Sequence, residues 1–257
     1  MPTLLLVLSG PQQAWGSRSR FATRATELAP TKSGVIGLLA AALGMERTAP
    51  LDRFGKIRFG VRIDQPGTVE RDFQTTRSLD GKSFPLSHRF YLADAVFLVG
   101  IEAERGELLA YQAALTQPYF PLFLGRRAFP PDGPVRTALV ASPLRQALSE
   151  WKWEAKPSHQ RTIRRAEVSL ELVLDLEGDE VSGETRQDVP ESFDPRRRRH
   201  GFRDVTMITT TMPHPDPPGP RASDGPPPRG GAMTRSAELL GSPTEHDPEA
   251  LLTDEEL

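Results

Sequence analysis

Two stretches of the sequence combine glycine with basic side chains, which are residue types that bind phosphate groups. The first stretch, within residues 9–34, contains the candidate ligands Trp15, Gly16, Arg18, Arg20, Arg24, Lys32, Ser33 and Gly34. The second is Gly125-Arg126-Arg127, in a segment bracketed by prolines. Glycine lets a backbone approach closely, and the planar guanidinium of arginine matches the geometry of a phosphate. These residues predict a surface that binds a phosphodiester backbone or a nucleotide.

The segment that holds Lys32 has two interpretations. Lys32-Ser33-Gly34 resembles the end of a nucleotide-binding P-loop, but the glycine that this motif requires upstream of the lysine is absent. A nucleoside triphosphatase is therefore disfavoured. The other interpretation uses the same physics, because the unpaired amides of a helix N-terminus and a nearby lysine attract the phosphate of a polynucleotide.

Trp15 also has two interpretations. A tryptophan usually packs on the core, but this one is followed by Gly16 in a polar loop. An indole in such a loop can stack on a base of a single-stranded nucleic acid. The residue types alone leave both roles open.

Local patterns describe the scaffold that carries these residues. Residues 3–8 (TLLLVL) lack strict alternation, which is typical of a strand buried on both faces. A long polar loop follows, and then a helix that Thr31 or Ser33 caps. A strand that delivers a basic loop to a helix N-terminus forms a cradle for phosphate.

The polar stretch from residue 64 to residue 92 predicts a long protruding hairpin. Its arms are residues 69–78 and 86–92, and Asp80-Gly81 between them is a favourable turn dipeptide. So few aliphatic residues are unlike a core element. Its exposed sides carry the basic or polar candidates Arg71, Arg77, Lys82, His88, Arg89 and Tyr91.

The remaining patterns predict an α+β protein. Residues 57–63 alternate as a strand with one buried and one arginine-bearing face, residues 95–102 form a buried strand, and residues 106–117 form a helix. This order of elements suggests a ferredoxin-like domain. The second half is richer in strands, with Ser142-Pro143 starting a short helix and a hairpin near Glu177-Gly178.

Composition limits the classes of protein. The chain of 257 residues has no cysteine, which excludes disulfides and thiolate metal sites. Its histidines are scattered, so we expect no metal site and no cofactor. No run of about 18 apolar residues occurs and no signal peptide is evident, so we expect a soluble, cytoplasmic protein without membrane contact.

Composition also divides the chain. From residue 213 onward nine acidic and three basic residues give a net charge of −6, which leaves residues 1–212 at +4 against −2 for the whole chain. Ten of the 25 prolines lie in this last segment, which predicts disorder. We expect a ferredoxin-like part at 1–118, a β-rich part at 119–212 and a disordered, acidic, proline-rich tail at 213–257.

Three motifs together resemble the CasD family, the RAMP-type subunits of the type I-E CRISPR surveillance complex, Cascade. They are residues 8–16 (LSGPQQAWG), 30–44 (PTKSGVIGLLAAALG) and 124–127 (LGRR). Their order and spacing match over about residues 2–212, which is more specific than any one glycine pattern. The proline-rich tail lies outside the resemblance.

The resemblance implies a function in antiviral defence. Family members have an RRM-like, ferredoxin-type RAMP domain with a β-hairpin thumb and a smaller β-rich C-terminal part. Their role is to hold the 5′ handle of the CRISPR RNA (crRNA) and cap one end of the complex, in contact with the CasC backbone and the large CasA subunit. The stretch at 64–92 matches the thumb. Direct contact with target DNA is left open.

Two other functions compete with that of a non-catalytic RNA-binding subunit. Some relatives, in other CRISPR subtypes that lack a separate processing enzyme, are endoribonucleases. A metal-independent endoribonuclease that processes precursor crRNA is therefore one alternative, in which His88 and Tyr91 supply the acid and base. In the type I-E branch a different subunit, CasE, cleaves the precursor, so we expect no enzyme here. A general RNA-binding protein is disfavoured, because the strands lack an RNP-type aromatic pattern.

Overall fold

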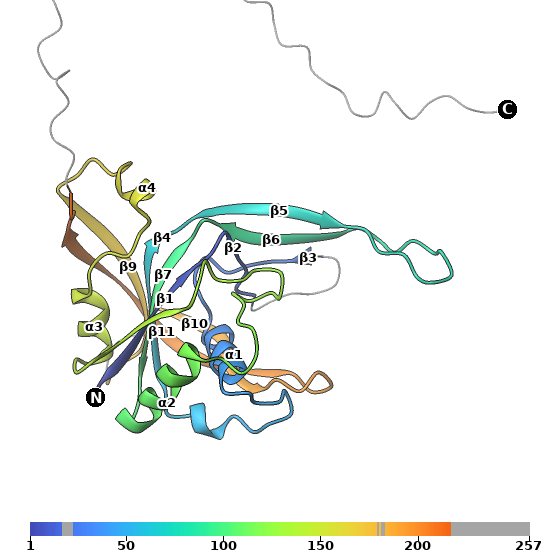
Figure 1. Cartoon of the computed structure of the whole chain (residues 1–257), viewed down its shortest axis with the longest axis horizontal. Coiled ribbons are helices and arrows are strands. Elements are labelled where there is room, and N and C mark those ends of the chain that lie inside the picture. Colours follow the sequence, from blue (N-terminus) through green and yellow to red (C-terminus); the bar gives the residue numbers. More distant parts are fainter. Residues whose placement is uncertain (17–22, 179, 181–182, 217–257) are drawn as a thin grey trace, which may run out of the picture. The chain divides into compact units, whose positions relative to one another are not determined.

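The computed structural model describes residues 1–16, 23–178, 180 and 183–216. Within these residues the main element is an antiparallel sheet with the strand order β10-β11-β9-β4-β7-β1-β8 (Figure 1). Its strands are β1 (Thr3–Ser9), β4 (Arg58–Gln65), β7 (Val96–Glu102), β8 (Arg136–Val140), β9 (Glu167–Asp175), β10 (Glu184–Ser192) and β11 (Arg199–Pro213). The fold is therefore mixed α and β, with the C-terminal strands in the same sheet as the N-terminal ones.

Helices cover both faces of the sheet centre. The helical elements are α1 (Lys32–Ala42), η1 (Asp52–Phe54), α2 (Arg105–Thr116), α3 (Leu144–Glu150) and α4 (Pro157–Gln160). In β1, Leu4, Leu6 and Leu8 belong to the core formed with α1 and α2, whereas Leu5 and Val7 pack with α3. This confirms the prediction of a first strand buried on both faces.

The predicted hairpin is confirmed and extends the β4–β7 pair beyond the large sheet (Figure 1). Its strands β5 (Thr68–Gln74) and β6 (Ser87–Ala93) pair antiparallel along their whole length. The turn uses Gly81 at φ +86°, a conformation that glycine adopts at little cost. Along the other edge of β6 lie two short strands, β2 (Gln12–Gln13) and the parallel β3 (Thr23–Arg24).

The bend between the β4–β7 pair and the hairpin is specified by Gly67 and Asp94. Gly67 has φ +71°, and a Cβ there would lie 2.5 Å from the carbonyl oxygen of Ala93, so only glycine fits. Asp94 also has a positive φ of 56°. Its carboxylate accepts a hydrogen bond from Gln65 Nε2 at 2.9 Å and an ion pair from Lys156 Nζ at 2.7 Å. These contacts hold the hairpin at one angle to the sheet.

The predicted arginine-bearing face of β4 is wrong at Arg62, whose side chain is fully buried. Its guanidinium donates two hydrogen bonds to Asp64, at 2.7 and 2.9 Å. It also donates to the backbone oxygens of Leu148, Trp151 and Lys152. Burial raises the pKa of the Asp64 carboxyl despite this neighbouring charge. Arg62 therefore anchors the segment after α3 to the sheet.

Two local predictions in the second half are also corrected. The predicted hairpin near Glu177-Gly178 does not form, because β9 pairs with β4 and β11, and β10 pairs with β11 outside them. The chain after β9 therefore passes the position of β11 to reach the outer edge of the sheet. Helix α3 forms where predicted but begins one residue later, because Pro143 is its N-cap and Leu144 its first residue. The Glu102 carboxylate accepts from the first amide, Leu144 N, at 2.7 Å.

Residues Met1–Pro218 form one compact unit. The second unit, Gly219–Leu257, lies outside the described residues, and with it nearly all of the predicted tail. Among the described residues, no helix has the length and apolar character needed to cross a membrane.

The buried Arg62–Asp64 pair gives a stability prediction. Substitution Arg62→Met leaves the Asp64 carboxylate buried without its cation, so the free energy of unfolding should fall by about 3–5 kcal/mol. Arg136→Met is the matched control, because Arg136 is 59% exposed in its ion pair with Glu154 and should change stability by less than about 1 kcal/mol. Urea unfolding measures both. Equal stabilities of the two variants would contradict the anchoring role.

Candidate nucleic-acid interface

Three arginines from distant parts of the chain meet on the paired part of the β5–β6 hairpin, residues 68–74 and 87–93, which we call the hairpin base. Arg24 in β3 is the register partner of Arg89 in β6. Arg126 reaches both strands, because its Nη2 donates to the carbonyl oxygens of Phe90 at 2.9 Å and Arg24 at 3.2 Å. We call Arg24, Arg89 and Arg126 the arginine cluster. It joins both stretches of glycine and basic residues to the predicted hairpin.

The arginine cluster concentrates positive charge. Burial, and then the charges of Arg89 and Arg24, lower the pKa of the Arg126 guanidinium. The Asp72 carboxylate, opposite Arg89 on β5, acts in the other direction. Like charges held close together repel each other, and a polyanion placed among them relieves the repulsion. The cluster is therefore suited to bind phosphates.

Gly125 specifies the loop that presents Arg126. It has φ +85°, and a Cβ there would lie 1.7 Å from the carbonyl oxygen of Ala14. The loop closes on itself through hydrogen bonds from Leu124 N to Phe129 O at 2.7 Å and from Phe129 N to Arg126 O at 2.9 Å. The close approach predicted for this glycine is thus made by the protein's own backbone. Arg127 is exposed beside it.

An aromatic group adjoins the arginine cluster. The Tyr91 ring lies 5.5 Å from that of Phe129, and the Arg126 guanidinium lies 5.6 Å over the Phe129 ring. Alternate residues of a strand share a face, so Tyr91 lies on the same face of β6 as Arg89. Phe129 is buried and supports the partly exposed Tyr91. A half-exposed ring beside guanidiniums can stack on a base.

The structure does not bring together His88 and Tyr91, the two residues of the endoribonuclease alternative. These residues are three positions apart on β6, so their side chains leave opposite faces of the strand. Cross-strand pairing agrees, because His88 faces Phe73 whereas Tyr91 faces Glu70. His88 Nδ1 is buried without a hydrogen-bond partner among the described residues. The two side chains are therefore not placed to act together on one phosphodiester.

The outer hairpin carries the remaining predicted arginines. Arg71 is exposed on the His88 face, opposite Phe90, and Arg77 is exposed near the turn, in a bridge with Ser83. Exposed apolar side chains lie among them at Phe73, Leu79 and Phe84. The hairpin therefore presents a mixed cationic and apolar surface.

Trp15 packs in the core, one of the two roles that its sequence context allows. It is 1% exposed, and its Nε1 donates to Gln13 Oε1 at 3.1 Å. Gly34 makes room for it, because a Cβ there would lie 2.8 Å from the indole ring. Gly16 is exposed next to it. Arg18 and Arg20 lie outside the described residues.

The prediction that Lys32 and the α1 N-terminus bind phosphate is corrected by the structure. The Lys32 amide donates to the Asp188 carboxylate at 2.8 Å, and Lys32 Nζ donates to Ile57 O at 2.8 Å and to Asp175 at 2.9 Å. Ser33 is buried beside it. An internal carboxylate therefore occupies the place of the expected phosphate.

Arg203 also links α1 to the C-terminal strands. We call Lys32, Asp175, Asp188 and Arg203 the Asp188 joint. Its guanidinium donates to both Asp175 and Asp188. Burial alone would raise the pKa of Asp188, but the hydrogen bonds and charge of Arg203 hold it below its usual value. No sequence signal near Lys32 identifies these partners, because they lie more than 140 positions further along the chain.

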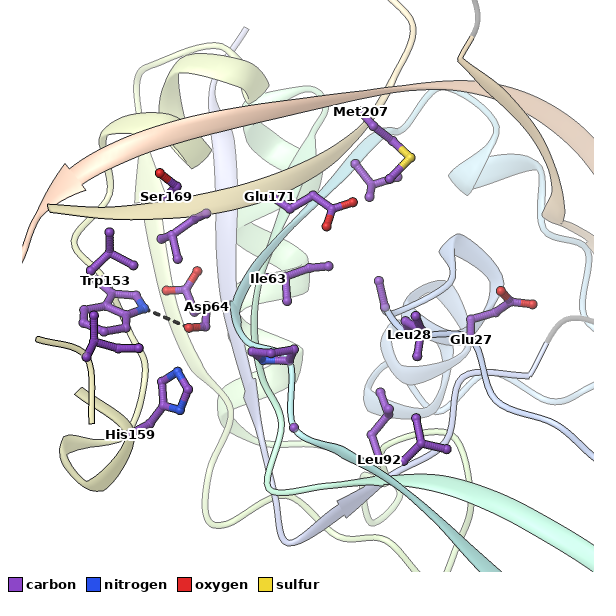
Figure 2. A pocket seen from close by; sticks show the side chains of 18 of the residues that line it. Glu27, Leu28, Ile63, Asp64, Leu92, Trp153, His159, Ser169, Glu171 and Met207 are labelled. Carbon is purple, nitrogen blue, oxygen red and sulfur yellow. Dashed lines mark hydrogen bonds between the residues drawn. The ribbon is translucent and has the colours of Figure 1, made fainter. Parts of the chain in front are cut away.

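A groove of about 600 Å³ lies on the other side of the hairpin base (Figure 2). Its lining includes Leu92, which leaves β6 on the face opposite Arg89 and Tyr91. Trp153 forms one wall, fixed by a hydrogen bond from its Nε1 to Asp64 O at 2.8 Å, and Met207 lies at the far end. Sequence reasoning missed this groove because its walls come from widely separated segments.

An antiparallel α+β fold with a projecting hairpin and an arginine-lined base has the features of a nucleic-acid-binding protein, and comparisons with known proteins narrow the class. The family model described as CRISPR-associated protein (Cas_Cas5) matches residues 3–206. The curated Cascade subunit CasD of Escherichia coli strain K12 is 33% identical over 153 residues, which cover 51% of this chain and 68% of that protein. The chain belongs to this CRISPR-associated family, as the three sequence motifs predicted.

Two solved structures are similar to the chain. A chain of a CRISPR RNA-guided surveillance complex is 34% identical, with a TM-score of 0.66 over 82% of this chain and 91% of that one. A Cas protein crystal structure is 37% identical, with a TM-score of 0.62 over 82% and 95% of the two chains. The likeness therefore extends over most of the described fold.

The Asp188 joint gives a pH prediction. Because the folded-state pKa of Asp188 is depressed, its stabilising effect is complete above the unfolded pKa of about 3.9 and is lost as pH falls through the folded pKa. Asp188→Asn should lower the free energy of unfolding by about 2 kcal/mol at pH 7. The difference from the unsubstituted protein should shrink below about pH 4. Urea unfolding from pH 7 to pH 3 measures it, and a constant difference would contradict the assignment.

Proposed function

We propose that this chain is the non-catalytic, crRNA-binding subunit of a type I-E Cascade complex, and that it holds the 5′ handle of the crRNA at the arginine cluster. The observation that carries the proposal is the convergence of Arg24, Arg89 and Arg126 from three segments at the hairpin base. Membership of a Cascade complex is supported by the similar proteins, because one is a Cascade subunit and another is a chain of an RNA-guided surveillance complex.

Phosphates and bases would be held by different groups. The forked guanidiniums of the cluster bind phosphodiester oxygens, which positions the strand without reading its sequence. Tyr91 then offers a ring on which an unpaired base stacks, with Phe129 behind it. Arg127 extends the positive surface beside the loop and Arg77 adds positive charge near the turn, whereas Arg71 lies on the opposite face of the hairpin. RNA would therefore run across the hairpin base on the Tyr91 face.

The assembly role follows from the same fold. We propose that the β1-α1-β4-β7-α2-β8 order is a ferredoxin-like RAMP domain whose hairpin is the thumb, with a β-rich part after residue 118. The subunit would cap the CasC backbone next to CasA, in the cytoplasm, as part of antiviral defence. The exposed Phe73, Leu79 and Phe84 of the hairpin supply apolar area of the kind that protein interfaces bury.

Arg126 gives the direct test of handle binding. In the assembled complex, Arg126→Gln should weaken binding of handle-bearing RNA by at least about tenfold and lower the salt dependence of log K by about 0.7 for each lost phosphate contact. Arg126→Lys keeps the charge but loses the fork, so it should recover only part of the affinity. Arg105→Gln removes an exposed charge at the start of α2 and is the matched control. Filter binding over a salt series measures all three.

Two results would count against the proposal. Arg126→Gln with the affinity of Arg105→Gln would remove the arginine cluster from the handle site. Cleavage of precursor RNA by the purified chain without CasE, lost in His88→Ala, would replace a holding role with the endoribonuclease alternative. We expect neither, because His88 and Tyr91 lie on opposite faces of β6.

A further inference from the structure

A second basic surface lies at the end of the β10–β11 hairpin. Four consecutive arginines, Arg196–Arg199, join the two strands, and all four are exposed. We call them the arginine turn. In Figure 1 this turn (orange) extends to the same side of the compact unit as the β5–β6 hairpin. None of the elements of the arginine cluster contributes to it.

The arginine turn has a defined shape. Phe193, just before it, packs against the core that contains α1, and its ring lies beside Gly37. Asp194 then organises the turn, because its Oδ1 accepts from Arg196 N at 2.8 Å and its backbone oxygen accepts from Arg197 N at 3.0 Å. Backbone order already present in the free protein does not have to be created on binding, which lowers the entropic cost of association.

The charge of the arginine turn is poorly compensated. Within the described part of the chain, one ion pair reaches it, between Arg199 and Glu191 at 3.8 Å, and both of these side chains are largely exposed. Burial, followed by the charge of Arg198, lowers the pKa of the neighbouring His200. Arg196, Arg197 and Arg198 thus form a positive surface on a shaped turn. A partner with closely repeated negative charges would complement it.

We propose that the arginine turn binds the phosphodiester backbone of a nucleic acid, as a contact separate from the arginine cluster. Guanidiniums bind phosphate oxygens in a bidentate way, and a nucleic acid repeats these groups along its length. The inference rests on the proposed function only in that nucleic acid must reach this subunit. The strand is either crRNA or target DNA, since both present the same chemistry.

The test compares two triple variants, each of which removes three positive charges from one place on the surface. The first variant is the triple substitution Arg196→Gln, Arg197→Gln and Arg198→Gln, which leaves Arg199 and its ion pair with Glu191. The matched control removes three exposed arginines near α4, away from both hairpins in Figure 1, by Arg161→Gln, Arg164→Gln and Arg165→Gln. Both variants have the same net charge. All six positions are exposed, and thermal unfolding checks that each protein folds.

Assembled complexes with each variant are titrated with handle-bearing RNA and, after loading with crRNA, with a target DNA duplex, each over a salt series. The arginine-turn variant should lower the salt slope of log K by about 2 for RNA or by about 3 for duplex DNA, because each phosphate contact contributes about 0.7 or 0.9. The strand that shows the change is the ligand. The control variant should keep the original slope.

Two outcomes would overturn the inference. Slopes equal to those of the control for both RNA and DNA would show that the turn touches neither strand. Failure of the arginine-turn variant to join the complex, while the control variant assembles, would show that the turn binds a protein instead. The Arg126→Gln result is independent, so the handle site can fail while the arginine turn stands, and the reverse also holds.

Discussion

The pairing of β4 with β7 in the buried centre of the sheet determines where the arginine cluster lies. The two strands continue, past a bend at Gly67 and Asp94, into β5 and β6 of the hairpin. The core therefore sets the register and direction of β6, and β6 carries Arg89 and Tyr91. Because β3 and the loop at 124–129 both attach to β6, the position of all three cluster arginines depends on this pair.

A second constraint joins the two ends of the described fold. Asp175 and Asp188, from the C-terminal strands, bind Lys32 at the start of α1 and are bridged by Arg203. A helix N-terminus attracts an anion by its unpaired amides and dipole, and here a carboxylate of the same chain supplies it. The N-terminus of α1 near Lys32 therefore does bind an anion, but this anion is a carboxylate of the same chain and not a phosphate.

Sequence patterns predicted those parts of the fold that depend on interactions between residues close together in the sequence. The doubly buried β1, the Thr31 cap of α1 and the hairpin turn at Gly81 each depend on a few neighbouring residues. The burial of Arg62 could not be predicted, because its acceptors at 148–152 come from another segment. The same holds for the candidate site: the arginines were identified by type, but a hydrogen bond between residues 102 positions apart brings Arg126 to Arg24.

We propose that crRNA crosses the hairpin base at the arginine cluster, on the Tyr91 face of β6. Photo-cross-linking of the assembled complex, with a crRNA that carries 4-thiouridine in its 5′ handle, followed by peptide mapping, locates the RNA on this subunit. We expect cross-links to the β6 peptide that contains Tyr91 and to the loop at 124–129. Cross-links confined to other surfaces, such as the groove beside Trp153 or the α3 face, would contradict it.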